Sequence, residues 1–334
     1  MKRTRGIAVL LTCLAWTSVA AAQPPEDFRA RQQELREQRA ATRAQAQADA
    51  TAQKKETAAQ RRAGAAQGQR GGQAEASETF TRTARLERGG TLDLQNGFGD
   101  VTITGNGDRE VTIEVIKQAR ALNDARARLA LNGTRVDIAE RGGNVEVRTL
   151  RAVGPGQVAV NYVITLPENA NIVLRSASGT LRVQKMAGDE LSVDTLQGNV
   201  IVSDLRSRML ELHTVMGDML LRDVAAQRAF VQSMRGNLEY AGPLQRTGQY
   251  RFQTHSGNIR VKIPSGGPGF DLDAMTSTGD LQSDFALRLP QQRPALRRPA
   301  PLRILRGPVG DAGAMLTAHS FSGNIVLLKP QGSQ

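Results

Sequence analysis

Cysteine is nearly absent from this chain of 334 residues, and its scarcity excludes several kinds of chemistry. The only cysteine is Cys13, which lies in an apolar stretch near the start. Once that stretch is removed as a leader, the mature chain has no disulfide, thiolate nucleophile or cysteine-ligated metal. Lipid attachment at Cys13 is an alternative, although Thr12 is bulkier than the residue that usually precedes a lipid-modified cysteine. We therefore expect packing and hydrogen bonds to hold the fold.

Histidines, aromatic residues and catalytic motifs are also scarce. The only histidines are His213, His255 and His319, and no HExxH, GxSxG, P-loop or complete GxGxxG pattern occurs. We interpret the histidines as solvated surface residues and expect no catalytic residue, no cofactor and no metal. Aromatic residues make up only 4% of the chain, and Trp16 lies in the leader. This argues against a sugar-binding site built on aromatic platforms.

A basic surface spread over the whole chain is lacking too, although the formal net charge is +12. Residues 1–22 contribute three basic side chains, residues 23–80 contribute ten basic and eight acidic ones, and residues 284–306 contribute six arginines against one aspartate. The remainder therefore carries only +2. Because the excess is confined to a leader and one insertion, we expect no nucleic-acid partner.

The first 22 residues have the three parts of a secretory signal peptide. A basic start is followed by a mostly apolar run from Ile7 to Val19 and by Ala20–Ala22, an A-x-A cleavage site. We expect an exported protein in the periplasm or at the cell surface, and an uncleaved anchor is the alternative. No later run reaches the ~20 apolar residues of a spanning helix, so no transmembrane span is expected after cleavage.

Residues 23–79 are rich in Ala, Gln and Arg and have almost no large apolar side chains. Without an apolar stripe to bury, packing cannot support a helix, and the a and d positions of a coiled coil are missing. We therefore expect a disordered or partly helical tether.

From residue 80 onward, short alternating runs with β-branched residues are separated by Gly, Asn and Asp, which is typical of strands and turns. Residues 118–131 differ, because Ala and Leu recur there at helical spacing before Asn132-Gly133. We expect residues 80–170 to form an α+β lead-in with one short helix.

Residues 171–330 contain a repeated unit with one glycine per copy. The steps between successive glycines are 19, 19, 19, 21, 22 and 44 residues, and two upstream glycines fit the same local frame. A period near 20 residues is the mark of a repeat architecture. The glycines of the frame are Gly99, Gly143, Gly179, Gly198, Gly217, Gly236, Gly257, Gly279 and Gly323.

Apolar residues recur two and four positions after each glycine and five and seven positions before it. This period of two on both flanks predicts two short strands per unit, each with one buried face. Ser or Thr recurs three positions before the glycine, and Asn or Asp directly follows it, with Thr180 as the exception. We expect these short polar side chains to stack at a corner and to hydrogen-bond the turn backbone.

We therefore predict a mainly β fold, a β-solenoid or roll-like stack with one short helix near its start. The alternative is a stack of β-hairpins forming a large antiparallel sheet or sandwich.

The recurring [Ser/Thr]-x-x-Gly-[Asn/Asp]-apolar-x-apolar unit, together with the lead-in VNYVITLPENANIVLRSASGTLRV at 160–183, resembles the bacterial β-strand-repeat family of unknown function labelled "putative adhesin". The resemblance covers roughly residues 90–330. It implies an exported or envelope-facing protein and supplies no catalytic or ligand residue.

Two surfaces are candidates for function. One is the outward row four positions before each glycine, which runs Gln95, Arg175, Asp194, His213, Gln232, Gln253, Met275 and His319. The other is the proline-rich insertion 284–308, for which we hypothesise contact with an anionic envelope surface, while a solvated loop is the favoured alternative. Its arginines are Arg288, Arg293, Arg297, Arg298, Arg303 and Arg306.

The sequence thus favours a non-enzymatic, exported protein with a scaffolding or adhesion-type role in the cell envelope. Its partner would be an anionic envelope surface or an envelope protein, and its oligomeric state is unknown. One alternative is an envelope-stress or signalling accessory that binds a membrane or a protein. The other is a β-helical polysaccharide-active enzyme.

Overall fold

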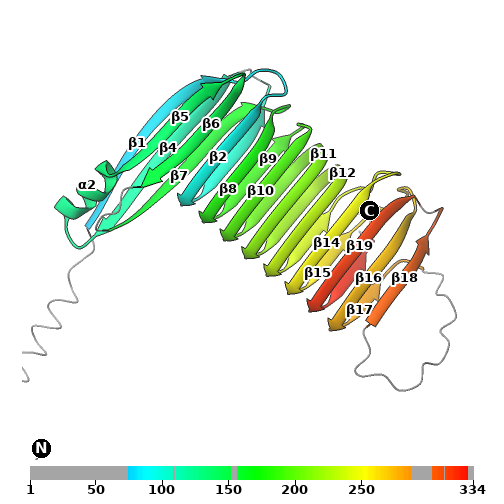
Figure 1. Ribbon diagram of the computed structural model, residues 1–334. Helices are drawn as coiled ribbons and strands as arrows, with labels where there is room; N and C mark the ends of the chain where they lie inside the picture. Colours follow the sequence, from blue (N-terminus) through cyan, green and yellow to red (C-terminus); the bar gives the residue numbers. More distant parts are fainter. Residues whose placement is uncertain (1–73, 108–109, 152–155, 287–302, 312, 330–334) are drawn as a thin grey trace, which may run out of the picture. The chain divides into compact units, whose positions relative to one another are not determined.

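A computed structural model describes residues 74–107, 110–151, 156–286, 303–311 and 313–329 (Figure 1). These residues belong to one compact unit, which comprises residues 72–334. The expected signal peptide, and the expected tether as far as residue 73, lie outside the described residues. The predicted mainly β fold with one helix is confirmed for the part of the chain that the structure describes.

The described residues of the lead-in form seven strands and the helix. They are β1 (Ala74–Arg85), β2 (Thr91–Phe98), β3 (Val101–Asn106), β4 (Glu110–Ala121), α2 (Asp124–Asn132), β5 (Thr134–Arg141), β6 (Asn144–Arg151) and β7 (Gln157–Pro167). Strand β1 begins inside the range expected to be tether, because its residues pair antiparallel with β4 along their full length.

In the part of the repeats that the structure describes there are thirteen strands. They are β8 (Asn171–Ser178), β9 (Leu181–Met186), β10 (Glu190–Gln197), β11 (Val200–Met216), β12 (Met219–Arg235), β13 (Leu238–Ala241), β14 (Gln249–Ser256), β15 (Ile259–Lys262), β16 (Phe270–Thr278), β17 (Leu281–Ser283), β18 (Arg303–Val309), β19 (Ala314–Ser322) and β20 (Ile325–Leu328).

The helix is shorter than the range 118–131 that its composition predicts. Residues up to Ala121 continue strand β4, because Ala119 and Ala121 keep that strand's alternating burial and its backbone pairs with both β1 and β7. Strand pairing on both sides therefore overrides helix propensity here. The helix starts after Asn123, whose side-chain Oδ1 accepts a hydrogen bond from the Arg126 backbone N–H at 2.9 Å.

The repeats form a solenoid-like stack of parallel strands in two layers (Figure 1). In each coil the chain crosses the first layer, turns at the frame glycine, crosses the second layer and bends back into the next coil. Strands β11 and β12 pass through both layers and bend at Asp204 and Asp223, which have φ of 52°. Because each strand pairs in parallel with its counterpart in the next coil, the hairpin-stack alternative is wrong for these coils.

The first layer is built in the spatial order β2, β8, β10, β11, β12, β14, β19 and β16. The second layer is built in the order β3, β9, β11, β12, β13, β15, β20 and β17.

The turn glycines stack so closely that they leave no space for a side chain. A Cβ atom on Gly198 would lie 1.9 Å from the carbonyl oxygen of Gly179, and one on Gly217 would lie 1.9 Å from that of Gly198. Gly198 also has φ of 140°, a conformation that other residues rarely adopt. The recurring glycine of the sequence is therefore required by the contact between coils.

The residue after each glycine forms the predicted corner ladder. Asn199 Oδ1 accepts a hydrogen bond from the Asp218 backbone N–H at 3.0 Å, and Asp218 Oδ1 accepts one from the Asn237 N–H at 2.7 Å. Asn237 Oδ1 accepts one from the Asn258 N–H at 3.0 Å. Each side chain thus satisfies a backbone donor that the turn leaves free, which holds neighbouring coils in register.

The inward rows that the sequence predicts form the core. Nearly all of these side chains are buried. Tyr240, Tyr250 and Phe252 are the largest side chains of the inward rows in the repeats. Val136, Ile138 and Leu281 are partly buried because they lie near the two ends of the stack. Burying one such aliphatic or aromatic side chain contributes roughly 1.5–3 kcal/mol, so the core stabilises the stack only when many coils add up.

The order of the last coils differs from the sequence order. Strands β19 and β20 lie between the coil of Gly257 and the coil of Gly279, so the last coil in sequence is not the last in space (Figure 1). The 44-residue step gives the chain enough length to pass the end of the stack and return. The step also includes β18, which pairs antiparallel with β16. His213 and His319 are consequently three coils apart, one coil fewer than the order of the repeats in the sequence would give.

Gly143 also departs from the predicted frame. It lies in the turn of an antiparallel hairpin between β5 and β6, whereas the frame predicts a two-layer coil. Its local pattern of alternating apolar residues fits a hairpin equally well, because both arrangements share a period of two.

The glycine contact leads to a testable prediction. Gly198→Ala should destabilise the protein severely, by several kcal/mol, because the added methyl group would overlap a neighbouring carbonyl oxygen and the backbone has positive φ. The matched control is Gly97→Ala in β2, where no atom lies within 4 Å of the new Cβ. Urea unfolding followed by circular dichroism measures both. Equal stability of the two variants would contradict the argument.

Candidate functional site

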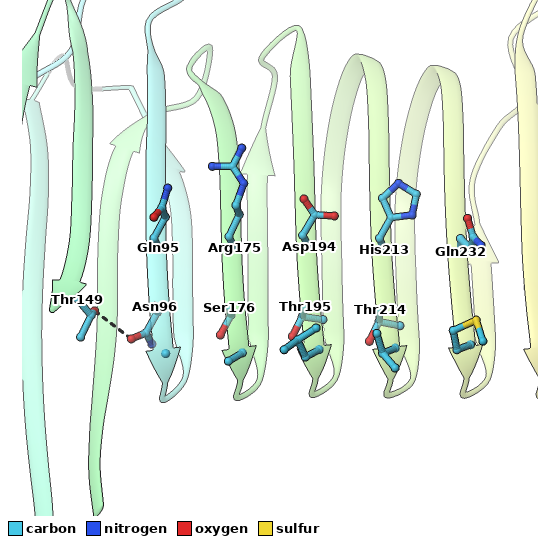
Figure 2. Close-up of a pocket in the computed structure, with 15 residues that line it drawn as sticks. Gln95, Asn96, Thr149, Arg175, Ser176, Asp194, Thr195, His213, Thr214 and Gln232 are labelled. Carbon is cyan, nitrogen blue, oxygen red and sulfur yellow. Dashed lines mark hydrogen bonds between the residues drawn. The ribbon is translucent and has the colours of Figure 1, made fainter. Parts of the chain in front are cut away.

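The outward row of the first layer is the candidate site. The strand register places its residues side by side, one per coil, from Gln95 through Arg175, Asp194 and His213 to Gln232 (Figure 2). The row then continues through Gln253, His319 and Met275. This is the side-by-side row that the repeat frame predicts, with its last two members exchanged by the altered coil order.

A second row lies beside the first, two residues closer to the glycine. Leu196, Val215 and Met234 are 61%, 44% and 51% exposed, and Ala177 precedes them in the coil of Gly179. We call Ala177, Leu196, Val215 and Met234 the apolar row. Together with the outward row from Gln95 to Gln232, the apolar row lines a shallow groove of about 770 Å³. Large apolar side chains exposed in a continuous line on a protein surface mark an interaction site.

The apolar edge extends beyond the groove. Phe98 and Met216 lie directly before their glycines, and Phe321 lies two residues before Gly323; they are 51%, 38% and 56% exposed. The Phe321 ring stacks on the His255 ring with centroids 4.9 Å apart. Sequence reasoning missed these residues because it followed only the position four before the glycine. The signal was the recurrence of apolar residues one and two positions before it.

The charged groups of the groove are nearly balanced. Arg175 Nη1 lies 3.2 Å from Asp93 Oδ1, and His213 Nε2 lies 3.0 Å from Glu211 Oε1. Asp194 lies between Arg175 and His213 and has no ion-pair partner among the described residues. The outward row thus offers hydrogen-bond donors and acceptors without a concentration of one charge.

The lead-in closes one end of the groove with a partly buried hydrogen-bond network. The Thr149 hydroxyl donates to Asn96 Oδ1 at 3.0 Å and lies 2.6 Å from the Tyr162 hydroxyl. The Asn96 amide donates to the Val160 carbonyl oxygen at 2.9 Å. Burial raises the pKa of Tyr162 to about 12, against the opposing effect of its hydrogen bond with Thr149. Tyr162 is therefore neutral at ordinary pH and acts as a fixed polar support.

A ladder of buried hydroxyl groups lies three positions before the glycines, and its two halves differ. In one half, the hydroxyls of Thr254, Ser320 and Thr276 donate to the carbonyl oxygen of a neighbouring turn glycine at 3.2, 3.0 and 2.8 Å. In the other half the hydroxyls have no hydrogen-bond partner among the residues that the structure describes. These are Ser176, Thr195, Thr214 and Ser233, and all but Ser233 belong to residues that line the groove.

This difference leads to a matched pair of substitutions. Thr276→Val removes a hydrogen bond in a fully buried position and should cost about 1 kcal/mol of unfolding free energy. Thr195→Val removes a buried hydroxyl that has no partner in the described part of the chain and should leave stability unchanged or raise it. Chemical denaturation of both variants checks the comparison. A larger loss for Thr195→Val than for Thr276→Val would show that Thr195 has a partner.

The predicted arginine surface is described only in part. Arg288, Arg293, Arg297 and Arg298 lie outside the described residues. Arg303 and Arg306 lie on β18 at the end of the stack, where Arg303 forms an ion pair with Asp280 and Arg306 Nε donates to Asp273 Oδ1 at 2.7 Å. These two arginines therefore form ion pairs with acidic side chains of the coil of Gly279, which lies at the end of the stack.

Asp273 is also the carboxylate next to His319. Burial opposes ionisation of Asp273, but the hydrogen bond and charge of Arg306, together with His319, outweigh it and lower the pKa of this carboxyl. His319 Nε2 lies 3.7 Å from Asp273 Oδ1 and is shielded from solvent. The side chain of His319 remains 27% exposed, as expected of a surface residue, but β16 packs beside it and brings Asp273 close to its shielded Nε2 atom.

The lowered pKa of Asp273 gives a pH-dependent prediction. A carboxyl whose pKa is lower in the folded state adds stability above its unfolded pKa of 3.8, and this is lost as pH falls through the folded pKa. Asp273→Asn should therefore be less stable than the wild type at neutral pH, and the difference should shrink below about pH 4. Urea midpoints measured between neutral pH and pH 2 test it. A difference that stays constant over this range would contradict the linkage.

The described residues contain no group of three or more His, Cys, Asp or Glu side chains arranged to hold a metal ion. Among the same residues, no helix is long and apolar enough to cross a membrane.

The family model described as Toastrack DUF4097 matches residues 72–299 of the chain. No curated protein is a match.

Three solved structures are similar to the chain at low identity. One, described as a "putative cell adhesion protein" from Clostridium sporogenes, is 13% identical, covers 75% of this chain and 100% of its own, and has a TM-score of 0.36. A "putative adhesin" from Bacteroides fragilis is 10% identical, with 75% and 97% covered and a TM-score of 0.38. A "putative lipid binding protein" from Parabacteroides distasonis is 11% identical, with 75% and 97% covered and a TM-score of 0.37.

Proposed function

The chain belongs to the Toastrack DUF4097 family, and from this premise we propose that it is a non-catalytic binding protein of the cell envelope that uses the groove of the first layer. The observation that carries the proposal is the apolar row, in which Leu196, Val215 and Met234 stay exposed in three successive coils. Exposed apolar side chains in a monomeric protein are usually scattered, whereas a contiguous line of them is typical of a contact surface.

The stack suits a scaffolding or adhesion-type role for a geometric reason. Every coil presents the same two outward positions, so a partner with a repeating structure meets one side chain of each row at a regular interval, while the side-chain chemistry changes from coil to coil. Many weak contacts then add up, because each further contact is made within an existing complex. This supports binding to an extended envelope component more than binding to a small molecule.

Export and domain organisation are part of the proposal. A signal peptide of residues 1–22 would direct the protein to the periplasm or the cell surface, and a tether from residue 23 would separate it from its point of release. The lead-in would be residues 80–170 and the binding stack residues 171–330, with strand β1 extending the folded part back to Ala74.

The insertion 284–308 is proposed as a second, electrostatic contact with anionic envelope material. Its support is the charge of six arginines against one aspartate in residues 284–306. Because Arg303 and Arg306 are engaged with Asp280 and Asp273, the proposal rests on Arg288, Arg293, Arg297 and Arg298. Such a contact would weaken as salt is raised, whereas an apolar contact in the groove would not.

Two other functions would use the same groove. An envelope-stress or signalling accessory would bind one dominant protein partner, which a pull-down from a bacterial envelope extract would recover. A polysaccharide-active enzyme would release soluble fragments from a polymer on incubation.

The proposed function predicts that the apolar row controls retention on a bacterial envelope preparation. The double variant Leu196→Asp and Val215→Asp should lose most of the retention, by at least tenfold, because two desolvated contacts become charged. Met315→Asp is the matched control, since Met315 is 57% exposed on strand β19 but does not line the groove. Co-sedimentation at two salt concentrations measures retention, and thermal unfolding verifies that each variant is folded. Unchanged retention of the folded double variant would refute the proposed function.

A further inference from the structure

We propose that the ligand of this groove is a linear, uncharged glycan that lies along the stack and therefore across the strands; the inference rests on the proposed binding role. The groove crosses five adjacent first-layer strands, from Gln95 on β2 to Gln232 on β12 (Figure 2). Neighbouring strands are about 4.8 Å apart, so these five strands span about 19 Å. Pyranose rings in an extended polymer repeat at a similar interval, so successive sugars would meet successive coils.

One bank of the groove is suited to sugar hydroxyls. Its five side chains end in planar groups with donor or acceptor atoms: the carboxamides of Gln95 and Gln232, the guanidinium of Arg175, the carboxylate of Asp194 and the imidazole of His213. A planar group with two polar atoms can engage two neighbouring hydroxyls of a sugar ring at once. All five are exposed or half-buried, so their polar atoms can reach a ligand.

The opposite bank is suited to the apolar face of a sugar ring. The apolar row lies two residues along the strand from the outward row, which separates the two rows by about 7 Å. A ring between them would place its C–H groups against Leu196, Val215 and Met234 and its hydroxyls toward the polar bank. Aliphatic side chains would replace the aromatic platforms that the sequence lacks, and the regular repeat would compensate for a weaker contact per ring.

Charge argues for an uncharged polymer over an anionic one. The polar bank carries one arginine and one aspartate, and Arg175 is already partnered by Asp93 at 3.2 Å, while Asp194 is free of any ion pair in the described part of the chain. An anionic chain would therefore meet an uncompensated carboxylate at the centre of the groove. A hydrocarbon chain would leave the five polar side chains desolvated without partners, which is costly.

The test is titration calorimetry of the mature full-length protein with uncharged β-1,4-linked gluco- and N-acetylglucosamine oligosaccharides of two to six sugars. Affinity should rise with length up to about four sugars, since that length fills the five strands. Asp194→Ala and Gln232→Ala should each weaken binding of the six-sugar ligand at least tenfold. Asp194→Asn, which keeps a planar acceptor without the charge, should weaken it less than Asp194→Ala. Met315→Asp is again the control that should leave binding unchanged.

Failure of this inference is distinguishable from failure of the proposed function. If no oligosaccharide binds, while envelope retention still depends on Leu196 and Val215, the glycan inference is overturned and the binding role stands. Groove-dependent binding of phosphatidylglycerol vesicles or of one envelope protein would likewise overturn it. So would a dimer in sedimentation analysis that the double variant Leu196→Asp and Val215→Asp dissociates, because the groove would then be occupied by a second copy.

Discussion

The contact between successive turn glycines is the constraint on which the rest of this structure depends. With a carbonyl oxygen about 2 Å from the place where a Cβ would lie, neighbouring coils cannot be built from any other residue at that position. The glycine contact fixes the register of both layers at once, because each turn joins a strand of the first layer to a strand of the second. The Asn and Asp ladder then holds that register with hydrogen bonds from side chain to backbone.

The fixed register aligns the outward positions of successive coils. Since every coil begins at the same point of the repeat, residues at one position form a straight row over many coils. A single solvent-exposed leucine says little about function, but Leu196, Val215 and Met234 in line form a surface. The same geometry spreads the candidate site along the axis of the stack, with one residue of each row per coil.

Most of the fold could be predicted from sequence because burial and turn chemistry are local signals. The period of two around each glycine identified the buried side chains, and Asn199 and Asp218 were predicted as corner residues from their type and position alone. The signals that failed were non-local. Gly143 has the same local pattern as a coil but sits in a hairpin, and residues 118–121 have helical composition but pair on both sides as strand. In the candidate site, the outward row was predicted. The apolar row was overlooked, although its residues recur two positions before the glycine.

The place of the last coil has a consequence for biosynthesis. Strands β19 and β20 fill a position between two coils that are earlier in the chain, so the stack cannot be completed in the order in which it emerges from the ribosome. The coil that contains β16 and β17 has no parallel neighbour of its own until residues 314–328 arrive. Until then the strands β14 and β15 present unpaired edges, which are prone to pair with other chains. Removal of the C-terminal residues would therefore act as the loss of an internal layer and would leave the preceding coil detached.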